Sequence, residues 1–306
     1  MNELLNWGAD VIVWAQQFQQ PLLRLPLVAL SWLGGQGYLL TLPLVVFAFN
    51  QRTGLRLAML FAATLFLNSV IKHVVALPRP FESYPHIVSA GEAGFSFPSG
   101  HAQLAVIFWG MLALDIRRWW FSLTALLLIL LTGYSRIYLG VHYPTDVVGG
   151  WLLGAASLAA WLRWRGDLEH YLATHGRLIQ LCWLLAATTL MWAAAGFFLH
   201  DSLLTGAIGF FLGCGLAAVV HPPGLNQPLV WWLQLGRYLI GMLLVLLMIA
   251  ALQKGAAILA WSTPLTSLVS MTLLGGWLIG GVPTMLDSLT ALVVNRTKRT
   301  ANKSGA

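Results

Sequence analysis

Long runs of apolar residues recur along most of the chain, and short polar stretches separate them. A helix needs about 20 mostly apolar residues to cross a bilayer, so runs of this length predict membrane-spanning helices. The sequence predicts about nine such spans, at roughly 26–49, 55–77, 99–114, 119–135, 145–163, 178–199, 203–220, 236–253 and 257–282. The expected fold class is therefore all-α, a polytopic helical membrane protein.

The first residues show a different pattern, in which apolar and polar side chains mix within one short segment. Residues 3–19 carry a set of large apolar side chains among polar ones, namely Trp7, Val11, Val13, Trp14 and Phe18, and Pro21 follows. Such an amphipathic segment is typical of a helix that lies in the membrane interface. A helix of a soluble core is the alternative, but the remaining sequence offers no soluble core for it to join.

Composition supports the membrane class and excludes a nucleic-acid-binding protein. The chain of 306 residues is 58% hydrophobic and 9% charged, and its mean hydropathy is +0.76. Soluble domains carry roughly 25% charged residues. The sequence pI of about 9.8 could suggest nucleic acid, but the basic residues are scattered through short loops and form no stripe interleaved with aromatic residues. The expected partners are membrane lipids.

Basic residues are distributed unevenly between the two sets of loops that alternate along the predicted spans. One set holds Arg52, Arg56, Arg117, Arg118, Arg163, Arg165, Arg177 and Arg237, and the C-terminal tail adds Arg296, Lys298, Arg299 and Lys303. The opposite set holds Arg24, Lys72, Arg79, Arg136 and Lys254. Because Lys and Arg accumulate in cytoplasmic loops, the first set is predicted to be cytoplasmic. The N-terminus then lies on the outer, periplasmic or lumenal, face.

The chain divides into three predicted regions. Residues 1–175 hold five spans and all of the candidate motifs, whereas residues 176–285 add four spans without a charge cluster and have no assigned role. Residues 286–306 are expected to form a basic cytoplasmic tail near anionic headgroups.

Three short motifs lie at the ends of apolar runs on the predicted outer face. They are Lys72-x6-Arg79-Pro80, Pro98-Ser99-Gly100-His101 and Ser135-Arg136-x5-His142-x3-Asp146. A cation at the end of a membrane helix often only extends to the lipid headgroups. Lys72, Arg79 and Arg136 instead share one face with two histidines, which favours a phosphate-binding cradle.

The second motif predicts the start of a helix, since it precedes the apolar run from Leu104 to Leu114. Pro98 suits a helix start, and Gly100 allows a close approach to the backbone. Free N–H groups at a helix N-terminus bind phosphate well. Taken alone, the motif is better explained as an ordinary loop-to-helix cap, but its neighbours favour phosphate binding.

The third motif places His142 and Asp146 four residues apart, across the start of the fifth span. A carboxylate that accepts a hydrogen bond from one ring nitrogen fixes the tautomer and leaves the other nitrogen free as a nucleophile. An interfacial His-Asp pair that only stabilises the helix start is the alternative, and it leaves Arg136 and His101 unexplained. Glu82, His86 and Glu92 lie in the same outer loop and are weaker candidates, which either tune access to the site or have no role.

Together, these motifs resemble the type 2 phosphatidic acid phosphatase superfamily, which includes lipid phosphate phosphatases, glucose-6-phosphatase and vanadium haloperoxidases. The pattern of that family is K-x6-R-P, P-S-G-H and S-R-x5-H-x3-D, in this order, and every position is present here. The resemblance covers roughly residues 20–165. The usual bacterial members have six spans, so this chain is expected to lack their first span and to add about four at its C-terminus.

The resemblance implies a role for each matching residue. His142 is the nucleophile that forms a phosphohistidine, Asp146 orients it, and His101 protonates the leaving oxygen and then activates water. The phosphoryl oxygens are held by Lys72, Arg79, Ser99, the Gly100 backbone N–H and Arg136. The resemblance implies no metal ion and no other cofactor, because the cations supply the charge stabilisation.

The leading hypothesis is a lipid phosphatase that acts on a phosphate monoester or pyrophosphate at the outer face of a bacterial inner membrane. The expected substrates are undecaprenyl pyrophosphate, phosphatidic acid, phosphatidylglycerol phosphate or a sphingoid phosphate. One alternative is a phosphotransferase that passes the phosphoryl group to a sugar or lipid acceptor, and another is a non-catalytic lipid carrier or scaffold. A phosphatase of soluble sugars stays open as well, and the sequence does not indicate an oligomeric state.

Overall fold

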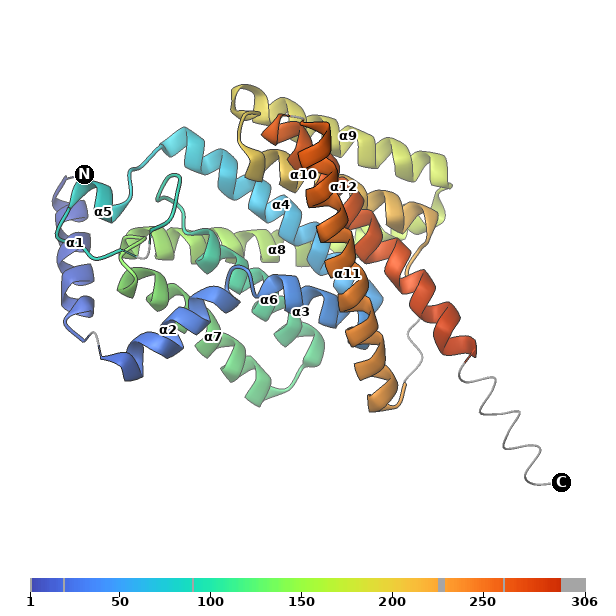
Figure 1. Cartoon of the computed structure of the whole chain (residues 1–306), viewed down its shortest axis with the longest axis horizontal. Coiled ribbons are helices and arrows are strands. Elements are labelled where there is room, and N and C mark those ends of the chain that lie inside the picture. Colours follow the sequence, from blue (N-terminus) through green and yellow to red (C-terminus); the bar gives the residue numbers. More distant parts are fainter. Residues whose placement is uncertain (1, 19, 90, 225–228, 261, 293–306) are drawn as a thin grey trace. The chain divides into compact units, whose positions relative to one another are not determined.

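The computed structural model describes residues 2–18, 20–89, 91–224, 229–260 and 262–292, all of which belong to helices or to the loops between them (Figure 1). No β-strand occurs in these ranges, so the expected all-α class is confirmed. Of the predicted basic tail, residues 293–306 lie outside the described residues. The contacts divide the chain into two compact units, which are described separately.

The first unit comprises Met1–Tyr38, Leu60–Thr174 and Ala194–Phe198. Its helices are α1 (Asn2–Gln16), α2 (Pro21–Leu33), the greater part of α4 (Gln51–Val75), α5 (Pro80–Ser83), α6 (Gly100–Ile116), α7 (Trp119–Tyr138) and α8 (Pro144–Thr174). The second unit holds α3 (Tyr38–Leu44), the π-helix η1 (Val45–Phe49), α9 (Arg177–Ala195), α10 (Ser202–Val220), α11 (Trp231–Leu259), α12 (Thr263–Gly276) and the π-helix η3 (Trp277–Gly281).

Each apolar run that the sequence predicts to span the membrane contains helix. Fewer than nine of the observed helices, however, have the length and the apolar composition that a membrane span needs. Among the described residues, seven helices are long and apolar enough to cross a membrane. The run 26–49 adds an eighth only if its two helices, which are separated at Gly34–Gly37, count as one span. α6 is a shorter apolar helix of 17 residues. The count of nine therefore stays a prediction.

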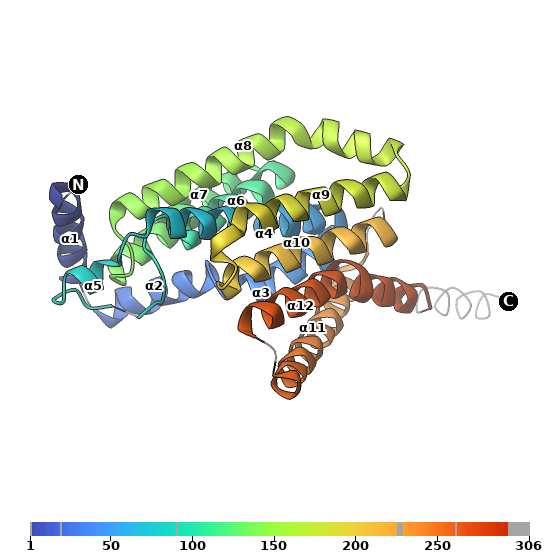
Figure 2. The same cartoon turned by 90° about the horizontal axis from the view of Figure 1, so that it is seen from above.

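Helices α6, α7 and α8 pack together in the first unit (Figure 2). Two glycines of α8 allow it to approach α6 at the level of the backbone. A Cβ atom at Gly150 would lie 2.5 Å from the Ser99 carbonyl oxygen, and one at Gly154 would lie 2.7 Å from that of Gln103. This is the close packing that small residues four apart allow between membrane helices. It fixes the start of α6 against the start of α8.

The predicted N-terminal helix is present as α1, and it runs across the ends of α7 and α8 (Figures 1 and 2). Ala9 and Ile12 are buried against the ring of Tyr143, whereas Trp7 and Trp14 are exposed. The helix is thus amphipathic, as the sequence indicates. Its position in the membrane interface stays a prediction.

The second unit is held together by close glycine contacts and by one buried arginine. A Cβ atom at Gly213 of α10 would lie 2.0 Å from the Thr272 carbonyl oxygen of α12. The Arg237 side chain of α11 donates to the Phe47 carbonyl oxygen (3.0 Å) and to the Asp287 carboxylate (2.7 Å). These polar contacts satisfy a charge that would be costly to bury in a membrane helix without a partner.

Candidate active site

All of the predicted site residues lie at one end of the helices in the first unit. Lys72 is in the last turn of α4, Arg79 precedes α5, and Arg136 is in the last turn of α7. Ser99 is the N-cap residue of α6, followed by Gly100 and His101 in the first turn. His142 lies in the loop between α7 and α8, and Asp146 is in the first turn of α8. The ends of five helices, α4, α5, α6, α7 and α8, therefore bring the three motifs together.

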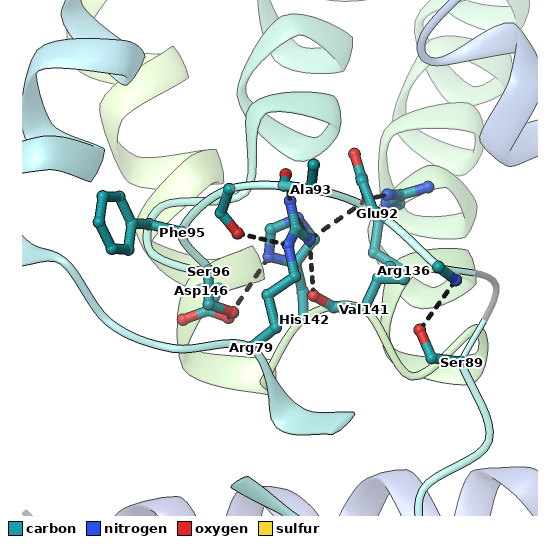
Figure 3. Close-up of polar contacts among 12 residues, drawn as sticks. Arg79, Ser89, Glu92, Ala93, Phe95, Ser96, Arg136, Val141, His142 and Asp146 are labelled. Carbon is teal, nitrogen blue, oxygen red and sulfur yellow. Dashed lines mark hydrogen bonds and ion pairs between the residues drawn. The ribbon is translucent and has the colours of Figure 1, made fainter. Parts of the chain in front are cut away.

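Asp146 is held in place by two hydrogen bonds and faces the ring of His142 (Figure 3). Its Oδ2 atom accepts from the Tyr143 backbone N–H at 2.8 Å and from the Ser96 hydroxyl at 2.5 Å. Nδ1 of His142 lies 3.4 Å from the same oxygen, which is the distance of an ion pair rather than of a short hydrogen bond. In the tautomer that carries its proton on Nδ1, this proton would face the carboxylate and Nε2 would keep its lone pair.

The other ring nitrogen of His142 faces the cations. Nε2 lies 3.4 Å from Nη1 of Arg79. Burial, reinforced by the nearby charges of Arg136 and Lys72, lowers the pKa of His142 well below its usual value. A histidine with a lowered pKa is neutral at neutral pH, which is the form that can attack an electrophile.

Backbone carbonyl groups fix the guanidinium group of Arg79. Its Nε donates to Gly94 at 2.8 Å, Nη2 donates to Ala93 at 3.0 Å, and Nη1 donates to Val141 at 2.9 Å. These bonds hold a buried cation beside Nε2 of His142 without neutralising its charge. A phosphoryl group that contacts His142 would therefore meet this guanidinium group.

Glu92 occupies the space between two of the predicted phosphate-binding cations (Figure 3). Its Oε2 atom accepts from Nη2 of Arg136 and lies 3.3 Å from Nη1 of Arg79. Burial alone would raise the pKa of the Glu92 carboxyl, but Arg136 and Arg79 outweigh it and hold that pKa below its usual range. Glu92 is thus an anion bound where the sequence predicts phosphate binding, so a phosphate that bound to both Arg79 and Arg136 would have to displace it.

We expect the substitution Glu92→Gln to strengthen inhibition by inorganic phosphate and vanadate about fivefold, or by about 1 kcal/mol. The amide keeps the shape of the side chain but removes the charge that competes for Arg79 and Arg136. The inhibition constants of both anions would be measured in detergent. The matched control is Glu82→Gln, because Glu82 accepts from the Arg79 backbone N–H at 2.9 Å and does not bridge the two guanidinium groups. Weaker inhibition in Glu92→Gln would contradict the competition.

The remaining cation and the start of α6 line the same site. The Lys72 ammonium group donates to the Phe95 carbonyl oxygen and lies 3.4 Å from that of Ser96. The Ser99 backbone N–H donates to the Asp146 carbonyl oxygen at 3.0 Å, while its hydroxyl is buried and has no hydrogen-bond partner in the described part of the chain. The N–H of Gly100 has no acceptor within its own helix, because it belongs to the first turn.

His101 borders a cavity of about 420 Å³ that also reaches Arg136 and Glu92. The cavity is lined by Arg24, Val28, Ser31, Trp32, Gln36, Gly91, Glu92, His101, Arg136, Leu139 and Val141. Its volume lies within the range of about 300–1,000 Å³ that is typical of ligand pockets. Gly35 borders the ring of His101, where a Cβ atom would lie 2.5 Å from Nε2.

Four further residues contact the predicted site residues, and the sequence predicts for none of them a contact with a catalytic or phosphate-binding residue. Glu92 and Ser96 belong to the loop before α6, and Ser31 accepts from Nη1 of Arg136. Gly35 leaves room for His101. Only Ser96 lies close to a motif, whereas Ser31 and Gly35 come from an apolar run far away in sequence. Within the described ranges, no group of three His, Cys, Asp or Glu side chains is arranged to hold a metal ion.

Comparison with known proteins gives consistent matches to one group. A sequence profile described as the PAP2 superfamily matches residues 53–170. An undecaprenyl-diphosphatase of Sulfolobus acidocaldarius is 34% identical over 114 residues, which cover 37% of this chain and 55% of that protein. Phosphatidylglycerophosphatase B of Bacillus subtilis is 33% identical over 151 residues, which cover 44% of this chain and 72% of that protein.

A solved structure also matches part of the chain. The crystal structure of a transmembrane PAP2-type phosphatidylglycerolphosphate phosphatase from Bacillus subtilis has a TM-score of 0.48 and 26% sequence identity. The match covers 55% of this chain and 88% of that one.

Proposed function

Because this chain belongs to the PAP2 superfamily, we propose that it is a membrane phosphatase that removes a phosphate group from a lipid. The observation that carries the proposal is the arrangement around His142, whose ring lies between the Asp146 carboxylate and the Arg79 guanidinium group. A neutral histidine between an anion and a buried cation is suited to attack phosphorus while the cation holds the phosphoryl oxygens. The chemistry is assigned to residues 1–175.

In the first step, Nε2 of His142 attacks the phosphorus atom of the substrate. The bond from phosphorus to the lipid oxygen breaks, and this oxygen keeps the electron pair and takes a proton from His101. Arg79, Arg136 and Lys72 hold the phosphoryl oxygens, together with Ser99 and the N–H of Gly100. Asp146 stabilises the positive charge that the ring of His142 acquires.

In the second step, water releases the phosphate. His101, which has lost its proton, accepts one from a water molecule whose oxygen attacks phosphorus. The phosphorus–nitrogen bond breaks, its electron pair returns to Nε2 of His142, and inorganic phosphate leaves. This cycle needs no metal ion, because the charges that develop are balanced by the side chains named above.

The proposed site faces the periplasm from a bacterial inner membrane, with the N-terminus outside and the C-terminus in the cytoplasm. The distribution of basic residues among the loops supports this orientation. A site at the ends of apolar helices suits a substrate whose phosphate group lies at the membrane surface and whose chains stay in the bilayer. The names of the relatives point to undecaprenyl diphosphate and phosphatidylglycerol phosphate as candidate substrates, besides phosphatidic acid and sphingoid phosphates.

The test is phosphate release by purified protein from a panel of lipid mono- and diphosphates, with glucose 6-phosphate as the soluble comparison. We expect release from at least one lipid, and activity that EDTA leaves unchanged and vanadate inhibits. Vanadate should inhibit because it takes the place of the phosphoryl group beside His142. A strict requirement for a divalent metal ion, or activity on glucose 6-phosphate alone, would overturn the proposal.

A further inference from the structure

The cavity beside His101 is lined on one side by a single stripe of α2. Arg24, Val28, Ser31 and Trp32 recur at intervals of four, three and one residues, so they share one face of the helix. Ser31 accepts from Nη1 of Arg136, which places this end of the stripe at the phosphate-binding cations. Arg24 lies seven residues earlier, or about 10 Å along the helix axis. The stripe therefore leads away from the reacting phosphate and ends at a cation.

The charge of Arg24 is not neutralised within the cavity. The cavity is lined by one carboxylate, that of Glu92, which is already paired with Arg136 and Arg79. Among the described residues, the Arg24 side chain makes no hydrogen bond or ion pair with another side chain. Arg24 is also one of two basic residues on the predicted outer side that no motif explains, the other being Lys254. Because Lys and Arg usually accumulate in cytoplasmic loops, a cation on the outer side indicates a role other than setting the membrane orientation.

The position of the cavity next to His101 identifies which part of the substrate it receives. His101 gives its proton to the leaving oxygen in the proposed reaction, so the leaving group lies on the side of His101. Val28, Trp32, Leu139 and Val141 give this space an apolar wall for the lipid part. Arg24 adds a site for an anion at a distance from the transferred phosphoryl group.

We propose that Arg24 binds a second phosphate that stays on the leaving group, so that the protein prefers lipids with two phosphates. This inference rests on the proposed phosphatase function. Two kinds of lipid have such a leaving group. In a lipid diphosphate, the inner phosphate stays on the lipid when the terminal one is removed. In phosphatidylglycerol phosphate, a phosphodiester stays on the lipid, and a glycerol unit separates it from the terminal phosphate. The separation of Arg24 from Ser31 along α2 favours the glycerol-linked lipid, whose two phosphates lie further apart. The leaving group of phosphatidic acid carries no such charge.

The test compares Arg24→Gln with the wild-type protein on phosphatidylglycerol phosphate, a polyprenyl diphosphate and phosphatidic acid in mixed detergent micelles. We expect the preference for a two-phosphate lipid, expressed as the ratio of its kcat/KM to that of phosphatidic acid, to fall about tenfold. Arg24→Lys should retain the larger part of this preference, because it keeps a positive charge. Arg52→Gln is the control, since Arg52 is an exposed cation in α4 that does not line the cavity.

The outcomes separate this inference from the proposed function. A fall for either two-phosphate lipid supports the inference and identifies which of the two Arg24 recognises. An equal loss on all three lipids, or no change on any, would overturn it while the protein remains a phosphatase. If the wild-type protein releases phosphate from none of the three, the proposed function itself fails.

Discussion

We expect His142→Ala to lower phosphate release more than about a thousandfold, because the loss of a nucleophile removes the covalent step. The ring of His142 is buried beside Asp146 and Arg79. Turnover would be measured on the best lipid of the panel, together with the thermal unfolding midpoint. Brief reaction with a labelled substrate should leave an acid-labile, base-stable phosphoprotein in the wild-type protein and none in the variant.

His86→Ala is the matched control for this substitution. His86 is exposed in the outer loop before α6, where its ring packs against Tyr84. Its removal should leave both turnover and the phosphoprotein intact. Substantial turnover in a folded His142→Ala protein would refute the assignment of the nucleophile, whatever the behaviour of His86→Ala.

The second large effect is expected for Asp146→Asn, which should reduce kcat by about 10³- to 10⁴-fold. The amide can still accept from the Tyr143 N–H, but it carries no charge to balance the imidazolium group. The measurement is single-turnover formation of the phosphoprotein, which isolates the step in which His142 acts.

Ser96→Ala separates the charge of Asp146 from its hydrogen bonding. This variant removes the 2.5 Å hydrogen bond from the Ser96 hydroxyl to the carboxylate and leaves the charge in place. We expect a loss of about tenfold or less, because a typical hydrogen bond contributes only about 0.5–1.5 kcal/mol. If Asp146→Asn lost no more activity than Ser96→Ala, the carboxylate would hold the loop before α6 in place and would not activate His142.

The sequence was sufficient to name the eight predicted site residues, because their spacing within three motifs is distinctive. It did not indicate that Glu92 contacts two of them. A carboxylate in a polar loop resembles many solvated ones, and its position between Arg79 and Arg136 arises only when the loop folds over the ends of α6 and α7. Ser31 and Gly35 were missed for a similar reason, since small residues in an apolar run carry no chemical signal of their own.

The apolar pattern located the helices better than it located their ends. The predicted span 145–163 lies within α8, which continues to Thr174 because the polar residues beyond the apolar run still favour helix. Arg163 and Asp167, one helical turn apart, form an exposed ion pair at 3.6 Å in this extension. The run 26–49 shows the opposite discrepancy, in which the helix is shorter than the pattern predicts. Its mostly apolar residues predict one continuous span, but Gly34, Gly35 and Gly37 interrupt the helix.

The backbone contact between α8 and α6 constrains how this site can change during evolution or engineering. Gly150 lies outside the three motifs, yet a Cβ atom there would lie 2.5 Å from the carbonyl oxygen of Ser99, the residue before the first turn that carries His101. Any larger side chain there would move the start of α6 as a rigid piece, and His101 would move with it. New substrate specificities are therefore accessible through α2, which lines the leaving-group cavity, whereas the α6–α8 contact is closed to variation.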